Sequence, residues 1–179
     1  MARFYQVSQR STTSASATEP LALAPGSAVK HAMLKTLDPL LGADLLYLLA
    51  SMGHGDEIAV VDANFPAAAC ARRLVRMDGC AAVPVVQAVL SILPIDDFVD
   101  APLATMAVVG SPDEVPDIVR EFQTAAEQAE GRALRAESLP RESFYARARE
   151  AFAIVQTGET RLYGNVLLRK GVVRAKAQA

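Results

Sequence analysis

The amino-acid sequence predicts an α/β fold, a single-domain α/β sandwich with a mainly parallel sheet. Short apolar runs rich in β-branched residues, such as residues 58–61, alternate along the chain with segments whose apolar residues recur at helical spacing. The chain has 179 residues, of which 51% are hydrophobic, and this is enough for one domain with a substantial core. Functional groups in such folds gather beyond the carboxyl ends of the strands.

The first half of the expected domain begins with a helix. Its leucines recur at helical spacing behind Asp44, which we expect to be the N-cap, and Gly53 ends it. The apolar stretch 40–52 has polar interruptions, which favour an amphipathic helix over a membrane span. Further along we expect a strand at 58–62, a short helix from Pro66, a strand at 74–77 and a helix from Pro84 that ends before Pro94.

Prolines and one glycine delimit the elements of the second half. Proline fits the first turn of a helix, where its missing N–H would have no helical partner, and glycine readily adopts the conformation that ends a helix. We expect a strand at 103–109, a helix from Pro116 to Gly131, a helix from Pro140 and late strands at 153–156 and 162–168.

Residues 1–32 differ in composition from the rest. Serines and threonines precede a Pro/Gly/Ala stretch, and such a segment cannot bury a core. A native tail, a vector-derived sequence and a weak imitation of a transit peptide all fit this composition. We expect an N-terminal extension without a catalytic role, which also contains His31, and we assign the functional domain to residues 33–179.

Composition excludes several classes of function. The net charge of -2 gives no general attraction to phosphate backbones, and the arginine clusters at 72–76 and 169–174 lie in no nucleic-acid motif, so no nucleic-acid partner is expected. Cys70 and Cys80 are too few for a zinc site. We expect both to be reduced packing residues in a cytoplasmic protein that binds no membrane.

His54 lies in the string Met-Gly-His-Gly-Asp-Glu-Ile, residues 52–58, and is the first candidate for chemistry. Imidazole can take and give a proton near neutral pH, as general acid–base catalysis requires. Gly53 and Gly55 leave its approach open. The alternative is a turn histidine that only caps a helix.

Three acidic residues lie near His54 in the sequence. Asp56 and Glu57 follow it, and Asp62 lies at the carboxyl end of the next expected strand. A carboxylate that accepts one ring N–H would fix the histidine tautomer, although each acid can equally be solvated or cap a helix. His54 and Asp62 become close neighbours only if the chain bends, because a five-residue strand spans roughly 17 Å.

The sequence has no phosphate loop, nucleophile elbow or dinucleotide fingerprint. We therefore expect an enzyme that works by proton transfer, with no cofactor, no metal and no covalent nucleophile. Two polar clusters, Arg141 with Tyr145 and the triplet Tyr163-Gly164-Asn165, suit the hydroxyls of a sugar because their donors and acceptors have fixed geometry. Tyr145 is also a candidate core residue.

These motifs occur together in one known family. The chain resembles the ribose pyranase and fucose mutarotase family from about Met33 to Val173, and is most similar to its L-fucose mutarotase branch. The resemblance rests on the string at 52–58, Asp62-Ala63-Asn64-Phe65-Pro66, Phe144-Tyr145 with Arg147, Ala151-Phe152-Ala153-Ile154-Val155, Thr157-Gly158-Glu159, Tyr163-Gly164-Asn165 and Lys170-Gly171-Val172.

The resemblance implies a function and an assembly. It implies that His54 is the catalytic proton donor of a sugar mutarotase that interconverts the α and β anomers of L-fucose or a related monosaccharide without a cofactor. It also implies a homo-oligomer, such as a decamer of two pentameric rings, with sites near subunit contacts. The positions that it matches to sugar binding are Asp62, Arg141, Tyr163, Gly164 and Asn165.

Three other functions remain open from the sequence. The same family also interconverts the pyranose and furanose forms of ribose, and a panel of sugars would separate the two activities. A non-catalytic sugar-binding protein would bind sugar and leave anomer exchange at its background rate. A purely structural assembly protein would bind no monosaccharide.

Overall fold

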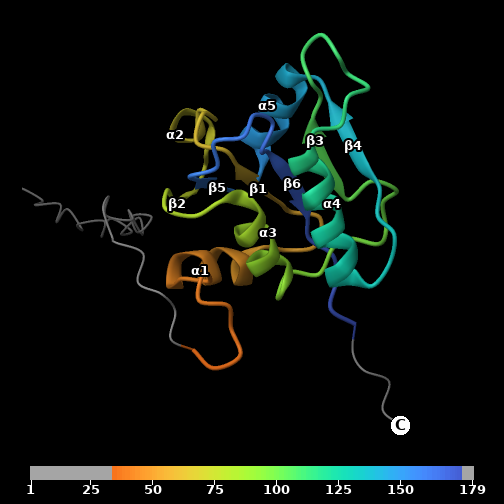
Figure 1. The fold of residues 1–179 in the computed structure, drawn as a ribbon. Helices are drawn as coiled ribbons and strands as arrows, with labels where there is room; N and C mark the ends of the chain where they lie inside the picture. Colours follow the sequence, from red (N-terminus) through yellow and green to blue (C-terminus); the bar gives the residue numbers. More distant parts are fainter. Residues whose placement is uncertain (1–33, 175–179) are drawn as a thin grey trace, which may run out of the picture.

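The computed structural model describes residues 34–174, which form a six-stranded sheet between two layers of helices (Figure 1). The predicted extension at 1–32 lies outside the described residues. The strands are β1 Glu57–Val61, β2 Leu74–Met77, β3 Leu103–Met106, β4 Ala136–Leu139, β5 Ala153–Thr157 and β6 Val166–Arg169. The helices are α1 Ala43–Ser51, α2 Ala67–Cys70, α3 Ala82–Leu90, α4 Asp117–Glu130 and α5 Arg141–Glu150.

The order of strands in the sheet is β2-β5-β1-β6-β3-β4. The pairs β2–β5, β5–β1 and β3–β4 are parallel, whereas β6 is antiparallel to both of its neighbours, β1 and β3. Five strands therefore run in one direction and β6 runs against them. The predicted α/β fold with a mainly parallel sheet is confirmed.

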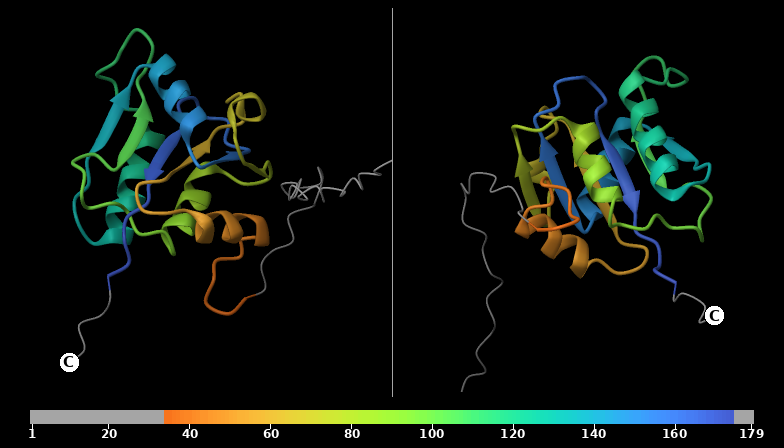
Figure 2. Two further views of the ribbon diagram at one scale, coloured as in Figure 1. Left: turned by 180° about the vertical axis from the view of Figure 1, so that it is seen from behind. Right: turned by 60° about the horizontal axis from the view of Figure 1, so that its bottom comes forward.

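Alternating residues of the central strand β1 face the two helical layers. Ile58 and Val60 belong to the larger core cluster, together with residues of α1, α3 and α4. Ala59 and Val61 belong to the second cluster, with residues of α2 and α5. All four residues are fully buried, as expected when helices cover both faces of a sheet. The two further views show helices on either side of the sheet (Figure 2).

The ends of several elements differ from the prediction. Gly42, not Asp44, is the N-cap of α1, and Asp44 lies in the first turn, where its negative charge favours the helix N-terminus. Strand β3 ends at Met106 and β6 begins only at Val166. Gly131 ends α4 in the left-handed conformation, with φ 65°, as predicted.

Strand β4 was missed by the sequence analysis. Ala136–Leu139 is an edge strand of four residues, and none of its residues is buried. It pairs only with β3 among the described strands. It has no apolar run to mark it, because its strand conformation depends on backbone hydrogen bonds to a neighbour that is distant in sequence.

Cys70 is buried and Cys80 is partly buried, and neither forms a disulfide bond. Among residues 34–174, no helix has the length and apolar character needed to cross a bilayer.

Candidate functional site

A pocket lined by both polar and apolar side chains lies beyond the carboxyl end of β1. Its volume is about 190 Å³, below the roughly 300–1,000 Å³ of drug-sized sites, so it suits a small ligand. It brings together four of the predicted sugar-binding residues from three parts of the chain. The lining residues are Asp62, Asn64, Phe65, Met106, Val109, Arg141, Tyr145, Leu162, Tyr163 and Asn165.

Asp62 is the buried acid of this pocket. Its side chain is almost fully buried beside Asn165, whose Nδ2 donates to Asp62 Oδ2 at 2.7 Å. The backbone N–H of Asn64 donates to Asp62 Oδ1 at 2.9 Å. Burial raises the pKa of Asp62, and the hydrogen bonds from Asn165 and from the backbone offset only part of that effect. The charged carboxylate is therefore held at a cost that a hydroxyl donor from a ligand would reduce.

The loop before β6 contributes the phenol and the amide. Tyr163 has φ 64°, a left-handed conformation that is uncommon for residues other than glycine. Its hydroxyl oxygen accepts a hydrogen bond from the backbone N–H of Val109 at 3.1 Å, which connects this loop to the segment after β3. Gly164 is not among the lining residues. A Cβ at Gly164 would lie 2.9 Å from Glu159 Cγ, so close packing accounts for this glycine.

Glu159 holds the same loop through hydrogen bonds with Arg161. Its carboxylate accepts hydrogen bonds from the backbone N–H and Nε of Arg161, both at 3.0 Å. The hydrogen bond from the Arg161 side chain lowers the pKa of Glu159 to about 2, against the opposing effect of burial. This ion pair fixes the turn that presents Tyr163 and Asn165.

Helix α5 carries Arg141 and Tyr145 to the pocket. Arg141 is the first residue of α5, and its exposed side chain contacts Glu142, with 3.3 Å between Nε and Oε1. Tyr145 is half-buried and packs edge-on against Phe65, with ring centroids 5.1 Å apart. Tyr145 is thus both a packing residue and a pocket residue.

His54 lies outside this pocket. It precedes β1, whereas Asp62 follows it, and five residues in a strand span roughly 17 Å. No bend brings the two ends of this regular strand together. Within one chain, the structure therefore separates the candidate acid–base group from the predicted sugar-binding residues.

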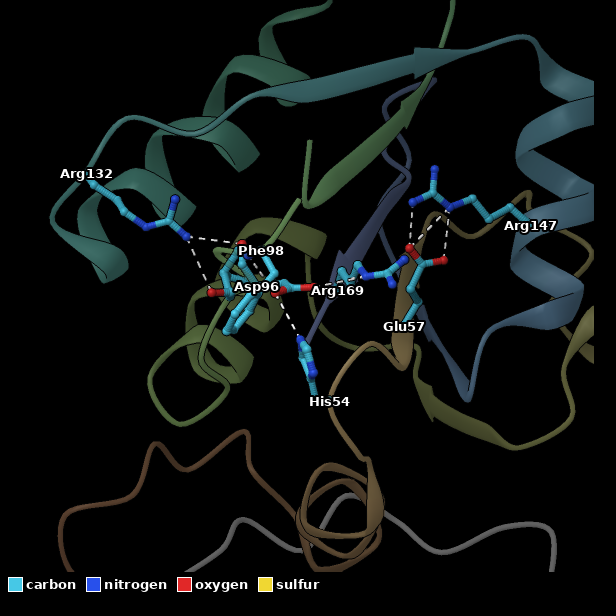
Figure 3. Close-up of polar contacts among 8 residues, drawn as sticks. His54, Glu57, Asp96, Phe98, Arg132, Arg147 and Arg169 are labelled. Carbon is cyan, nitrogen blue, oxygen red and sulfur yellow. Dashed lines mark hydrogen bonds and ion pairs between the residues drawn. The ribbon is translucent and has the colours of Figure 1, made fainter. Parts of the chain in front are cut away.

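The carboxylate partner of His54 is Asp96, which the sequence analysis missed. His54 Nε2 lies 3.2 Å from Asp96 Oδ1, and Asp96 is 1% exposed, whereas the imidazole is 46% exposed (Figure 3). The rings of His54 and Phe98 are tilted against each other, with centroids 5.2 Å apart. The two residues are 42 positions apart in sequence, so no local motif could have revealed the pair.

The acids next to His54 in sequence have other partners. Asp56 Oδ2 accepts the backbone N–H of Gly53 at 2.7 Å. Glu57 accepts three hydrogen bonds from Arg147 on α5, the shortest at 2.6 Å from Nη2. The hypothesis that one of the three acids around His54 orients its ring is therefore wrong, because these acids are engaged by the turn, by α5 and, for Asp62, by the pocket.

Arg169, the last residue of β6, and Lys170, which follows it, align the loop of His54 with the segment of Asp96. The backbone N–H of Gly55 donates to the carbonyl of Lys170 at 2.9 Å, and Gly55 has φ 85°. The backbone N–H of Asp96 donates to the carbonyl of Arg169 at 3.0 Å. Gly171 permits this approach, since a Cβ there would lie 2.7 Å from the carbonyl oxygen of Ile95.

The fold and these two clusters define a class of protein. The molecule is a small α/β protein with a small pocket of polar and apolar lining at the carboxyl edge of the sheet. At the opposite edge, the half-exposed His54 is paired with the buried Asp96. Among residues 34–174, no group of three or more histidine, cysteine, aspartate or glutamate side chains is arranged to hold a metal ion. Acid–base chemistry and the binding of hydroxyls are what these side chains can perform.

Comparison with known proteins shows the family. The model of the RbsD / FucU transport protein family matches residues 35–173, and the chain belongs to this family. The chain is 43% identical over 146 residues to the fucose mutarotase of Homo sapiens, which covers 78% of this chain and 94% of that protein. It is 40% identical over 140 residues to an L-fucose mutarotase of Haemophilus influenzae, covering 78% and 97%.

Solved structures agree with this assignment. The fucose mutarotase of Streptococcus pneumoniae in complex with L-fucose is 42% identical, with a TM-score of 0.74, and the match covers 79% of this chain and all of that one. A protein described as a putative sugar binding protein is 37% identical, with a TM-score of 0.77 over 81% and 99% of the two chains. RbsD of Bacillus subtilis, complexed with D-ribose, is 20% identical with a TM-score of 0.59 and shares the fold.

Proposed function

We propose that residues 33–179 form a cofactor-independent isomerase that interconverts the α and β anomers of L-fucose. The observation that carries this proposal is the pocket that joins Asp62, Arg141, Tyr163 and Asn165, in a chain whose relatives at 40–43% identity are fucose mutarotases. The relative solved with L-fucose bound supports the same substrate.

The reaction requires only proton transfer. A base removes the proton from the anomeric hydroxyl, the bond between the anomeric carbon and the ring oxygen breaks, and the ring oxygen takes up a proton. The resulting aldehyde rotates about its bond to C2 and closes on its other face. No net proton or electron is gained or lost, so a single imidazole such as His54 can serve both directions. General acid–base assistance typically contributes about 10²–10⁴-fold.

The binding residues then have distinct roles. Asp62, held by Asn165, accepts a hydrogen bond from a sugar hydroxyl, and Arg141 donates to oxygen atoms at the pocket entrance. Tyr163 lines the pocket, and its hydroxyl can relay a proton. Gly164 serves by allowing the loop to pack against Glu159.

The distance between His54 and the pocket suggests how the active site is completed. We propose that the protein is a homo-oligomer, such as a decamer, in which His54 of one copy closes the pocket of another. Exposed apolar side chains lie near both clusters. Phe98 is 65% exposed beside His54, and Val109 and Leu162 are 64% and 68% exposed at the pocket. A second copy that covers these side chains would remove their apolar surface from water, which stabilises association.

The activity can be tested by NMR magnetisation exchange between the two anomers of L-fucose, with D-ribose in the same buffer for comparison. We expect the protein to accelerate exchange for L-fucose and the His54→Ala variant to lose that acceleration while keeping its fold. Exchange that stays at the background rate despite sugar binding would instead support a non-catalytic sugar-binding protein. Failure to bind either sugar would support a structural role.

The assembly can be tested by mixing two inactive variants. In an equimolar mixture of His54→Ala and Asp62→Asn that has exchanged subunits, about a quarter of the sites built between two copies carry neither substitution. We expect corresponding recovery of activity on mixing. No recovery, in a sample shown to contain mixed oligomers, would mean that each site is built within one chain. The oligomeric state itself is measured by light scattering.

We also propose a cytoplasmic location. Neither Cys70 nor Cys80 forms a disulfide bond, and unpaired thiols of this kind are typical of reducing compartments. Fractionation of the native host, with detection of this chain in the membrane-free fraction, tests the proposal.

A further inference from the structure

We propose that Asp96 is the positioning residue of the proposed active site: it holds neutral His54 with its proton on Nε2, and so leaves Nδ1 as the nitrogen that exchanges protons with the sugar. This inference deepens the proposed function and depends on it for the identity of the reacting sugar. The tautomer of His54, in contrast, can be measured without any sugar.

The carboxylate of Asp96 can only accept hydrogen bonds. Burial acts to raise the pKa of Asp96. Hydrogen bonds from the backbone N–H of Phe98, from His54 and from Arg169, together with the charge of His54 when it is protonated, outweigh burial and hold this pKa below its ordinary value. The carboxylate is therefore ionised at neutral pH and has no proton to donate. The contact between His54 Nε2 and Asp96 Oδ1, at 3.2 Å, consequently requires the proton to be on Nε2.

The carboxylate of Asp96 is held in place by hydrogen bonds. Its Oδ1 accepts the backbone N–H of Phe98 at 3.0 Å, and its Oδ2 accepts Nε of Arg169 at 3.1 Å. Arg132 Nη2 donates to the backbone carbonyl of Asp96 at 3.2 Å. The backbone N–H of Asp96 also donates to the carbonyl of Arg169 in β6, so the backbone of Asp96 is fixed to the sheet. The carboxylate therefore has a fixed position relative to the ring of His54 (Figure 3).

The ring of His54 remains accessible to a ligand. The imidazole is 46% exposed although its carboxylate partner is 1% exposed. Figure 3 shows one ring nitrogen facing Asp96 and the other turned away from it. Phe98 packs against the ring at 5.2 Å between centroids, which limits its rotation. A fixed tautomer in an accessible ring is the arrangement in which a histidine acts as a directed acid and base.

The charge balance around the pair also fits this role. Arg169 places a permanent positive charge beside Oδ2 of Asp96. The carboxylate therefore stays ionised whether His54 is neutral or protonated. The other charged groups near the pair have their own contacts, Lys170 with the carbonyls at the end of α1, Arg174 with Asp97, and Asp56 with Gly53.

The test is the tautomer itself. We would label the histidines of the full chain with ¹⁵N and record long-range ¹H–¹⁵N correlations at a pH where the rings are neutral, identifying His54 by its absence from the His54→Ala spectrum. The expected result is a pyrrole-type shift for Nε2 and a pyridine-type shift for Nδ1. The opposite assignment, or an equal mixture of the two tautomers, would overturn the proposal.

The variant Asp96→Asn adds the catalytic readout. Its amide can donate to Nε2, so we expect the tautomer to shift toward Nδ1–H and the rate of L-fucose anomer exchange at saturating sugar to fall about 10–100-fold. The matched control is Asp97→Asn, which changes the neighbouring carboxylate, 32% exposed and paired with Arg174, and should alter neither reading. Circular dichroism establishes that both variants are folded.

The outcomes separate this inference from the proposed function. A folded Asp96→Asn variant that loses activity but keeps the Nε2–H tautomer would show a merely structural role. Full activity in that variant would refute a positioning role. If the wild-type protein has the predicted tautomer but does not accelerate exchange of L-fucose, the proposed function fails while the His54–Asp96 arrangement stands.

Discussion

Asp62 and Asn165 form a reciprocal pair of hydrogen bonds beyond the carboxyl end of β1. The backbone N–H of Asp62 donates to Asn165 Oδ1 at 3.1 Å, and Asn165 Nδ2 donates to Asp62 Oδ2 at 2.7 Å. Asp62 directly follows β1 and Asn165 directly precedes β6, so the pair joins two strands through residues that are 103 positions apart in the sequence. Asn165 therefore holds the pocket acid in position and offsets part of the rise in its pKa that burial causes.

Replacing Asn165 with alanine should weaken sugar binding and stability together. The change removes a donor from a buried carboxylate and leaves the N–H of Asp62 without its partner, which costs about 1–3 kcal/mol. We expect a corresponding loss in the free energy of unfolding and roughly tenfold weaker binding of L-fucose. Denaturant unfolding and calorimetric titration measure the two effects. The exposed Gln87→Ala on α3 is the control, and equal effects of the two variants would contradict the assigned role.

The ion pair of Glu159 should make stability depend on acid pH. The pKa of Glu159 is depressed to about 2 from an ordinary value of 4.5, so the ionised form stabilises the fold fully above about pH 4.5. That contribution is lost as the pH falls from 4.5 through 2. Glu159→Gln should therefore destabilise the protein by about 1–2 kcal/mol at pH 7, a value reduced from the full shift because Arg161 is partly solvated.

The difference in unfolding free energy between the wild type and Glu159→Gln should shrink when denaturant curves are repeated toward pH 3. A difference that stayed constant with pH would show that the effect of Glu159 is not due to its charge.

Arg147 should matter for stability although it lies outside the pocket. Its guanidinium contacts Glu57 on β1 and Glu137 on β4, and its side chain is only 26% exposed. The hydrogen bonds that Arg147 donates to Glu57 raise the pKa of Arg147, with burial acting in the opposite direction. Arg147→Ala leaves the largely buried Glu57 carboxylate without its partner, and we expect a loss of about 2–3 kcal/mol.

The matched control for Arg147 is Arg149→Ala, two residues along the same helix and exposed, with an expected change below about 0.5 kcal/mol. Thermal unfolding of both variants measures the contrast. Similar melting temperatures would mean that the contact with Glu57 contributes little.

Gly158 should tolerate no side chain. A Cβ there would lie 2.0 Å from the backbone carbonyl oxygen of Asp78, a contact that only a shift of the backbone could relieve. We expect Gly158→Ala to lower the free energy of unfolding by about 3 kcal/mol or more, at the upper end for overpacked sites. Gly79 is the control, because an added Cβ there would have no atom within 4 Å. Denaturant unfolding of both variants measures the contrast, and Gly79→Ala should leave the free energy of unfolding nearly unchanged.

The sequence by itself determined the elements that carry a strong local signal. Apolar β-branched runs gave the buried strands at 58–61 and 153–156, and the prolines and Gly131 marked the ends of helices, because these effects depend on neighbours in sequence. The same reasoning placed Asp62 at the end of its strand. The motifs also indicated the family, since several of them occur in order along the chain.

Only the tertiary structure decided what lies across the sheet. The antiparallel direction of β6, the edge strand β4 and the His54–Asp96 pair all depend on contacts between segments far apart in sequence. The structure also separated His54 from Asp62 by the length of β1, although they are eight positions apart. Sequence spacing measures distance along the chain, whereas pairing and packing set distance in space, and a regular strand converts a short spacing into opposite edges of one sheet.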